Sequence, residues 1–138
     1  MLNDLLINEY KNKIMTKLHS INVTKVIVYY SGSGDSGGID DIQFYINEQH
    51  QRQDTSFYSN KNNLDVLLDY ENKDITIHDF IYEFTDNLLQ HLYGSWYNDD
   101  GGNGEVHYLV NQKDIDQSEI IVNHNEVYTE YNTHRNKF

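Results

Sequence analysis

The side chains in this sequence that could carry out chemistry lie mainly in two glycine-rich segments, residues 30–41 and 93–106. Their carboxylates are hard oxygen ligands of the kind that Ca²⁺ and Mg²⁺ prefer. If both segments follow strands at one edge of a sheet, they could share an ion, and His107 could serve as a general acid or base beside Glu105. The residues that such a small metal-dependent hydrolase would use are Asp35, Asp99, Asp100, Glu105 and His107.

Two features favour the simpler interpretation that these carboxylates are solvated turn residues. Neither segment has the twelve-residue ligand pattern of an EF-hand loop. None of the seven histidines has another histidine four residues away, which is the spacing of a helical zinc site. We therefore predict no catalytic residue, no metal site and no cofactor.

The segment Gly34-Asp35-Ser36-Gly37-Gly38 has the same letters as the segment around the nucleophile of chymotrypsin-like serine proteases. Those enzymes need two β-barrels, and a histidine and an aspartate that precede the serine. The only histidine before Ser36 is His19, which falls in a predicted helix, so we reject the protease interpretation.

Net charge is the informative bulk property of the chain. Its formal value is −12, and residues 26–112 hold fifteen acids against three bases, which accounts for the whole excess. Such a field repels nucleic acid and favours a basic partner, although solubility alone would also explain it. Duplex DNA carries one charge per ~1.7 Å, so this charge could imitate roughly 20 Å of duplex if the carboxylates shared one face.

Twelve tyrosines are too many for one small core, so some of them must be exposed. Tyrosine is enriched in protein interfaces, and tyrosines among carboxylates indicate a protein-binding face more than a catalytic cleft. The predicted partner-binding residues are Asp35, Asp40, Asp41, Tyr45, Trp96, Tyr97, Asp99, Asp100 and Glu105.

A chain of 138 residues is expected to form a single acidic domain, 1–138. It contains no cysteine, and no apolar run approaches the ~20 residues of a membrane-spanning helix. Its first residues mix charged and apolar side chains, unlike a signal peptide. These features predict a cytoplasmic protein without membrane contact and leave its oligomeric state open.

Apolar periodicity predicts two long helices, at residues 3–20 and 77–93. Asn3 or Asp4 could cap the first helix, while Thr76 with Asp79 resembles a capping box at the second. Gly94 is well placed to end the second helix.

Alternating apolar residues predict four strands, at 23–30, 39–47, 105–110 and 120–124. The asparagines, aspartates and glycines of residues 98–104 predict a chain reversal with positive φ angles. Residues 48–63 are expected to be a mobile insertion and 126–138 a surface tail. The predicted fold is α+β, a two-layer sandwich in which two helices cover one face of a four-stranded, mainly antiparallel sheet, in the order α-β-β-α-β-β.

Three segments resemble the bacterial and phage family of unknown function 6878. They are residues 30–37, residues 94–105 and residues 124–129. Together with the helix before Gly94 they cover most of residues 26–134, whereas residues 48–63 have no counterpart. The resemblance implies no activity or catalytic residue. It does imply an association with mobile elements, on which small acidic proteins often disarm host defences.

Charge and resemblance together predict a non-enzymatic acidic binding protein. Its expected partner is a basic protein, in particular a defence nuclease whose nucleic-acid-binding surface it would occupy, as anti-CRISPR and antirestriction proteins do. Direct binding to nucleic acid is not expected. The alternatives are the metal-dependent hydrolase described above and an immunity protein that neutralises a toxin.

Overall fold

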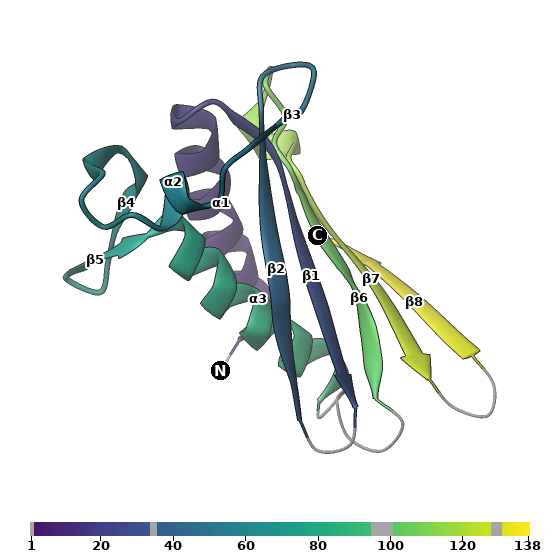
Figure 1. The fold of residues 1–138 in the computed structure, drawn as a ribbon. Coiled ribbons are helices and arrows are strands. Elements are labelled where there is room, and N and C mark those ends of the chain that lie inside the picture. The colour runs from purple at the N-terminus through teal and green to yellow at the C-terminus, as the bar shows by residue number, and fades with distance from the viewer. Residues whose placement is uncertain (1, 34–35, 95–100, 128–130) are drawn as a thin grey trace.

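Two layers, a sheet and a pair of helices, organise the protein (Figure 1). The computed structural model describes residues 2–33, 36–94, 101–127 and 131–138. The helical segments are α1 (Asp4–Ser20), α2 (Ser56–Ser59), η1 (Leu64–Val66), α3 (Ile77–Tyr93) and η2 (Ile115–Gln117). The strands are β1 (Val23–Ser33), β2 (Ser36–Ile46), β3 (Gln51–Gln53), β4 (Leu67–Tyr70), β5 (Lys73–Thr76), β6 (Gly102–Leu109), β7 (Glu119–Val127) and β8 (Tyr131–Lys137).

The main sheet is larger than the sequence predicts. Six strands pair in the order β3-β2-β1-β6-β7-β8, and β4 pairs with β5 in a separate two-stranded sheet. All neighbouring strands are antiparallel. The α+β class and the mainly antiparallel sheet are confirmed, but the prediction of only four strands is wrong, because β3 and β8 lack the apolar alternation that marks a half-buried strand.

The two long helices have the predicted positions and caps. The side chain of Asn3 accepts a hydrogen bond from the backbone N–H of Leu6, and that of Thr76 accepts one from Asp79. Gly94 follows α3 with a φ of 60°, a conformation that few other residues adopt easily. No helix within the described ranges is long and apolar enough to cross a membrane.

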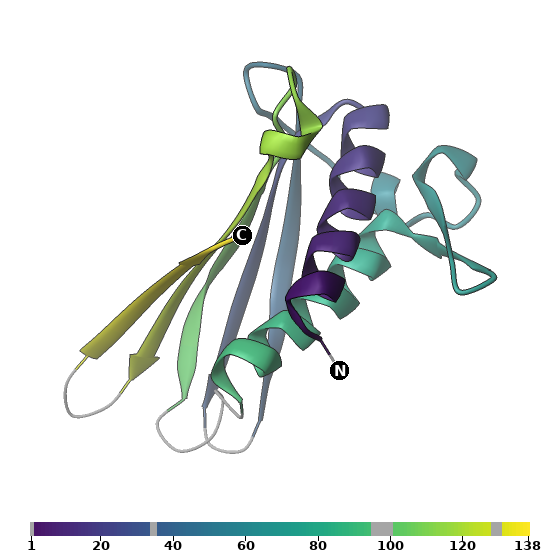
Figure 2. The same cartoon turned by 180° about the vertical axis from the view of Figure 1, so that it is seen from behind.

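Both long helices pack on the same face of the main sheet, as Figures 1 and 2 show from opposite sides. Central strand β1 contributes Val26, Val28 and Tyr30 to the core between the layers. From the helices, Ile14 and Leu18 of α1 and a stripe of α3 complete this core. The opposite face of the sheet carries none of the described helices (Figure 1).

Two segments contain regular secondary structure although the sequence predicts a mobile insertion for one and a surface tail for the other. Within residues 48–63, β3 pairs with β2, and Tyr58 of α2 stacks on Phe44 with ring centroids 4.1 Å apart. Within residues 126–138, β8 pairs with β7 from Tyr131 to Lys137. Both segments are mainly polar. Backbone pairing, the buried Tyr58 and a hydrogen bond from the Thr55 hydroxyl to the carbonyl of Ile42 hold the first, and backbone pairing and the Lys137–Glu119 ion pair hold the second.

Candidate functional site

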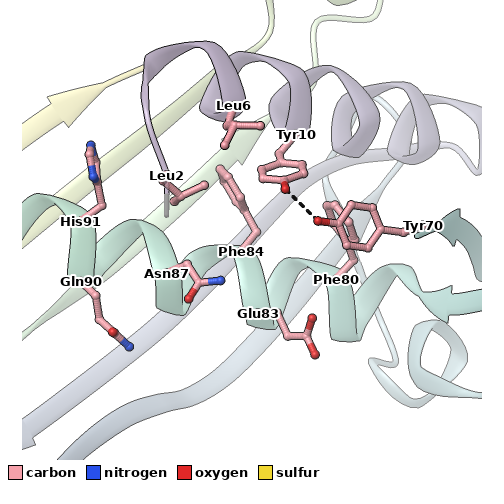
Figure 3. Close-up of a pocket in the computed structure, with 10 residues that line it drawn as sticks. All are labelled: Leu2, Leu6, Tyr10, Tyr70, Phe80, Glu83, Phe84, Asn87, Gln90 and His91. Carbon is pink, nitrogen blue, oxygen red and sulfur yellow. Dashed lines mark hydrogen bonds between the residues drawn. The ribbon is translucent and has the colours of Figure 1, made fainter. Parts of the chain in front are cut away.

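A groove between α1 and α3 is a feature of the helical layer that could receive a ligand. It has a volume of about 500 Å³, within the range of small-ligand and side-chain pockets. Leu2, Leu6 and Tyr10 line it from α1 and the residues ahead of it (Figure 3). The remaining lining residues are Tyr70, Phe80, Glu83, Phe84, Asn87, Gln90 and His91. We call these ten residues the helix groove.

Aromatic rings that contact one another edge-on form one end of the helix groove. Tyr10 meets Tyr70, Phe80 and Phe84 with centroid distances of 5.7, 6.0 and 5.8 Å. The hydroxyl oxygens of Tyr10 and Tyr70 are 2.7 Å apart (Figure 3). This hydrogen bond is the main reason that the pKa of Tyr70 is raised, and burial and the neighbouring Glu71 also contribute. The groove therefore has a fixed apolar wall with a hydroxyl pair at its end.

Carboxylates gather beside the helix groove, on the outer side of α3 and on the β4–β5 hairpin. Asp69 and Asp74 are direct cross-strand partners in that hairpin. Asp74, Asp79 and Glu83 line a second hollow together with Lys61 and Lys73. We call the set of Asp69, Glu71, Asp74, Asp79, Glu83 and Asp86 the acidic rim. Glu83 belongs to both the groove and the rim, so the apolar and the acidic surfaces are continuous.

The chemistry of the helix groove is suited to binding. Its one carboxylate, Glu83, and its one histidine, His91, lie eight residues apart on α3. At 1.5 Å per residue this is about 12 Å along the helix axis, too far for the two groups to share a proton. An apolar hollow bordered by carboxylates instead matches a partner that combines apolar and cationic side chains.

Several of the predicted partner-binding residues lie on the face of the main sheet opposite the two long helices. Asp41, Tyr45 and Glu105 are on this face, with His107 beside Glu105. We define the open sheet face by the residues that strand pairing places on it: Lys25, Ile27, Tyr29, Asp41, Gln43, Tyr45, Arg52, Glu105, His107, Leu109, Glu119, Ile121, Asn123, Arg135 and Lys137.

A chain of polar contacts follows β2 across the open sheet face. The Tyr45 hydroxyl donates to Gln43, 2.8 Å away, and the Gln43 amide donates to Asp41 at 3.1 Å. The ammonium of Lys25 lies 4.4 Å from the centroid of the Tyr45 ring. On β6, Nε2 of His107 is 3.0 Å from Oε1 of Glu105.

Tyr29 is one of the residues of this face that the site prediction missed. Strand pairing places it directly between Asp41 and Glu105. Burial raises the pKa of the Tyr29 phenol, and Tyr45, Glu105 and Asp41 raise it further. The alternation of residues 26–30 already assigns Tyr29 to the face opposite Val28, so the sequence contained the signal that would have found it.

The other predicted site residues have different positions. Asp40 lies at a register shift between β1 and β2, where it accepts a hydrogen bond of 2.6 Å from the hydroxyl of Ser31. Asp35, Trp96, Tyr97, Asp99 and Asp100 lie outside the described residues. The described carboxylates of residues 26–112 thus include one group on the open sheet face and a larger one on the acidic rim, and they do not share a single face.

The hypothesis of a shared metal ion rests largely on residues outside the described ranges. Asp35, Asp99 and Asp100 are among these, whereas Glu105 and His107 are described and contact each other. Within the part of the chain that the structure describes, no three His, Cys, Asp or Glu side chains are arranged to hold a metal ion.

The three segments that carry the family resemblance meet at one end of the sheet. Tyr30 of the first segment has its hydroxyl 2.7 Å from Nδ1 of the buried His124 of the third. Tyr93, which immediately precedes the second segment, stacks on the imidazole of His124 with centroids 3.9 Å apart. Gly102 and Gly104 of the second segment face these rings. This cluster fixes the strand ends and is a packing feature of the core.

The model of a family described as "Family of unknown function (DUF6878)" matches residues 6–138, nearly the whole chain. No curated protein and no solved structure matches the chain.

Proposed function

The chain belongs to the DUF6878 family, whose function is unknown, and we propose that it is a non-enzymatic binding protein. In this proposal the helix groove and the acidic rim together receive a basic, amphipathic segment of a protein partner. The observation that carries the proposal is the continuity of the apolar groove with the carboxylates beside it, through Glu83.

The apolar part of the site supplies the anchor. Phe80 and Phe84 are each 4% exposed and form a firm floor, while Leu2 and Leu6 form a partly exposed wall. A volume of about 500 Å³ admits a few side chains of a partner. Such a hollow is typical of interface centres, where a few anchoring side chains contribute most of the binding free energy.

The acidic part of the site supplies attraction and orientation. Asp69 and Asp74 repel each other across the hairpin, since like charges directly opposite in a sheet are destabilising. Cations of a partner would relieve this repulsion and would also be steered toward the site. Lys61 and Lys73 offset only part of the negative charge there.

The partner class that this surface favours is a nucleic-acid-binding protein with a basic surface. A defence nuclease, inhibited in the anti-CRISPR or antirestriction manner, is the case we propose. The six carboxylates of the acidic rim correspond to roughly 10 Å of duplex, at one charge per ~1.7 Å. Charge mimicry alone would therefore cover little of such a surface, and the helix groove would provide the additional contact.

A pair of synthetic peptides tests the binding mode. The first is an 18-residue peptide of leucine and lysine with one apolar helical face, and the second has the same composition in scrambled order. We expect the purified chain to bind the first peptide more tightly in isothermal titration calorimetry. A triple variant of the rim, Asp79→Asn, Glu83→Gln and Asp86→Asn, should weaken binding roughly tenfold, at ~0.5 kcal/mol per exposed charge pair.

A matched variant removes three carboxylates elsewhere, through Glu48→Gln, Asp114→Asn and Asp116→Asn, and should change the affinity less than twofold. Leu6→Ser should weaken binding without altering the charge. Equal affinity for both peptides, or an equal loss in both triple variants, would count against the proposal. For the nuclease itself, DNA cleavage by the restriction and CRISPR enzymes of the natural host should be inhibited by the wild type and not by the rim variant.

A further inference from the structure

Ile27 is the apolar centre of the open sheet face, and its neighbours across β2 and β6 are Gln43 and His107. Ile27 is 7% exposed although none of the described helices covers it. It is the midpoint of three successive outward positions of β1, Lys25, Ile27 and Tyr29. Outward positions on a strand are about 6.8 Å apart, so Lys25 and Tyr29 lie equally far from Ile27 on opposite sides.

Along the neighbouring strands β2, β1 and β6, the charge on this face changes sign across Ile27. On one side lies Lys25, whose neighbours across β2 and β6 are Tyr45 and Leu109. On the other side lies Tyr29, whose two neighbours are the carboxylates Asp41 and Glu105. A face with a cation at one end and a carboxylate pair at the other is complementary to itself when it is turned over.

We propose that the open sheet face is the interface of a symmetric homodimer, in which Lys25 of each copy lies over Tyr29 of the other, between Asp41 and Glu105. The two-fold axis of this dimer lies in the plane between the two sheets and is perpendicular to the strands. It passes between Ile27 of one copy and Ile27 of the other. Any contact between two different residues then occurs twice, as an isologous interface requires. The strands of the two sheets stay nearly aligned, which is the common mode of sheet-on-sheet packing.

The chemistry at the proposed contact is favourable. The ammonium of Lys25 already lies over an aromatic ring within one copy, 4.4 Å from the centroid of Tyr45. Over Tyr29 of the second copy it would find another ring and two carboxylates, and a cation between these groups gains both cation–π and charge attraction. Ile27 of one copy would meet Ile27 of the other and become fully buried.

The two-fold axis sets how much of the face the two copies share. Six strands spaced about 4.8 Å apart give a width of about 29 Å. β6 crosses the axis at His107, so its residues 105–109, at about 3.4 Å each, face the second copy over about 17 Å. The resulting area of roughly 490 Å² per copy is below the ~800 Å² per partner of a standard interface, so we expect a weak dimer that depends on its charge pairs.

Charge reversal in two separate variants tests this arrangement. Sedimentation velocity should show the wild type as a dimer at ~50 µM. Lys25→Glu alone, and Asp41→Lys with Glu105→Lys, should each sediment as monomers with unchanged circular dichroism. An equimolar mixture of the two variants should recover a heterodimer, because each of its two contacts again pairs opposite charges. The control variant is Lys61→Glu, since Lys61 does not lie on the open sheet face, and this variant should remain dimeric.

Crosslinking provides a second test that does not depend on charge reversal. The chain contains no cysteine, so Ile27→Cys introduces a single thiol at the proposed axis. A short bismaleimide should join two copies of this variant efficiently and should not join two copies of Lys61→Cys. A wild type that is monomeric at ~500 µM, variants that stay dimeric, or a mixture that stays monomeric would each overturn the proposal. These results are independent of peptide binding in the helix groove, so the two proposals can fail separately.

Discussion

Gly104 is required for close packing, although the sequence pattern suggests that it is required for a turn. The sequence predicts a turn with positive φ at residues 98–104. Gly101 does have a positive φ, of 82°, whereas Gly102 and Gly104 are strand residues of β6. A Cβ atom on Gly104 would lie 2.0 Å from the carbonyl oxygen of Asn123 and 2.6 Å from the hydroxyl of Tyr30. Close approach, and not a turn, requires glycine here.

Gly104→Ala should therefore destabilise the protein strongly. The added methyl group meets backbone that cannot easily move, and overpacking of this kind costs about 2–3 kcal/mol. Urea denaturation followed by circular dichroism measures the change in the free energy of unfolding. Gly38→Ala is the matched control, because a Cβ there meets nothing within 4 Å. Similar unfolding free energies for the two variants would contradict this explanation.

Among the elements, α2 shows how a short polar segment is held by one side chain. Tyr58 is 1% exposed and stacks on Phe44 of β2. Burial raises the pKa of Tyr58 to about 12, because the phenolate would lose its hydration in this position. In the unfolded chain the same phenol ionises near pH 10.

This difference predicts a loss of stability at high pH. Since the pKa is higher in the folded state, the stability that Tyr58 contributes is intact below about pH 10 and is lost as the pH rises toward 12. Tyr30 and Tyr108, whose pKa values are also raised by burial, act in the same direction. Tyr58→Phe should reduce the loss between pH 9 and pH 11 by about 1 kcal/mol, as measured by urea denaturation at each pH. An identical pH dependence in both proteins would show that Tyr58 ionises freely.

At the same scale, the sequence predicts those elements whose burial follows a simple period. Apolar residues recur along α3 with helical spacing, and its bounds, cap and terminating glycine are all as predicted. Strands β3 and β8 escape prediction because backbone pairing at a sheet edge needs no apolar pattern. The helix groove also escapes it, because Tyr10, Tyr70 and Phe84 come together only through the packing of separate elements.

The whole molecule carries a formal charge of −12, and six of its 22 acidic residues belong to the acidic rim. Some of this charge opposes folding, since carboxylates of the rim lie close to one another in the folded state and farther apart in the unfolded chain. Asp69 and Asp74 are the clearest such pair.

Salt should therefore stabilise the protein. Raising NaCl from 0.01 to 0.3 M shortens the screening length from about 30 Å to well below 10 Å, which weakens this repulsion and should raise the melting temperature by several degrees. Asp74→Asn should stabilise the protein at low salt by about 0.5 kcal/mol and reduce the gain from salt. Lys73→Gln removes a neighbouring cation and should have the opposite effect. A melting temperature that is independent of NaCl in all three proteins would contradict the argument.

The pairing of β1 with β6 also determines the order in which this protein can mature on the ribosome. Gly32 of β1 pairs with Gly102 of β6, seventy positions later in the chain. A nascent polypeptide that has emerged only as far as α3 can form the β1–β2 hairpin, but one side of β1 then still lacks its neighbour. Until β6 emerges, that side is an open edge to which another nascent chain could add a strand. Synthesis that stops between α3 and β6 is thus expected to give aggregates, while a stop after β7 leaves β1 enclosed on both sides.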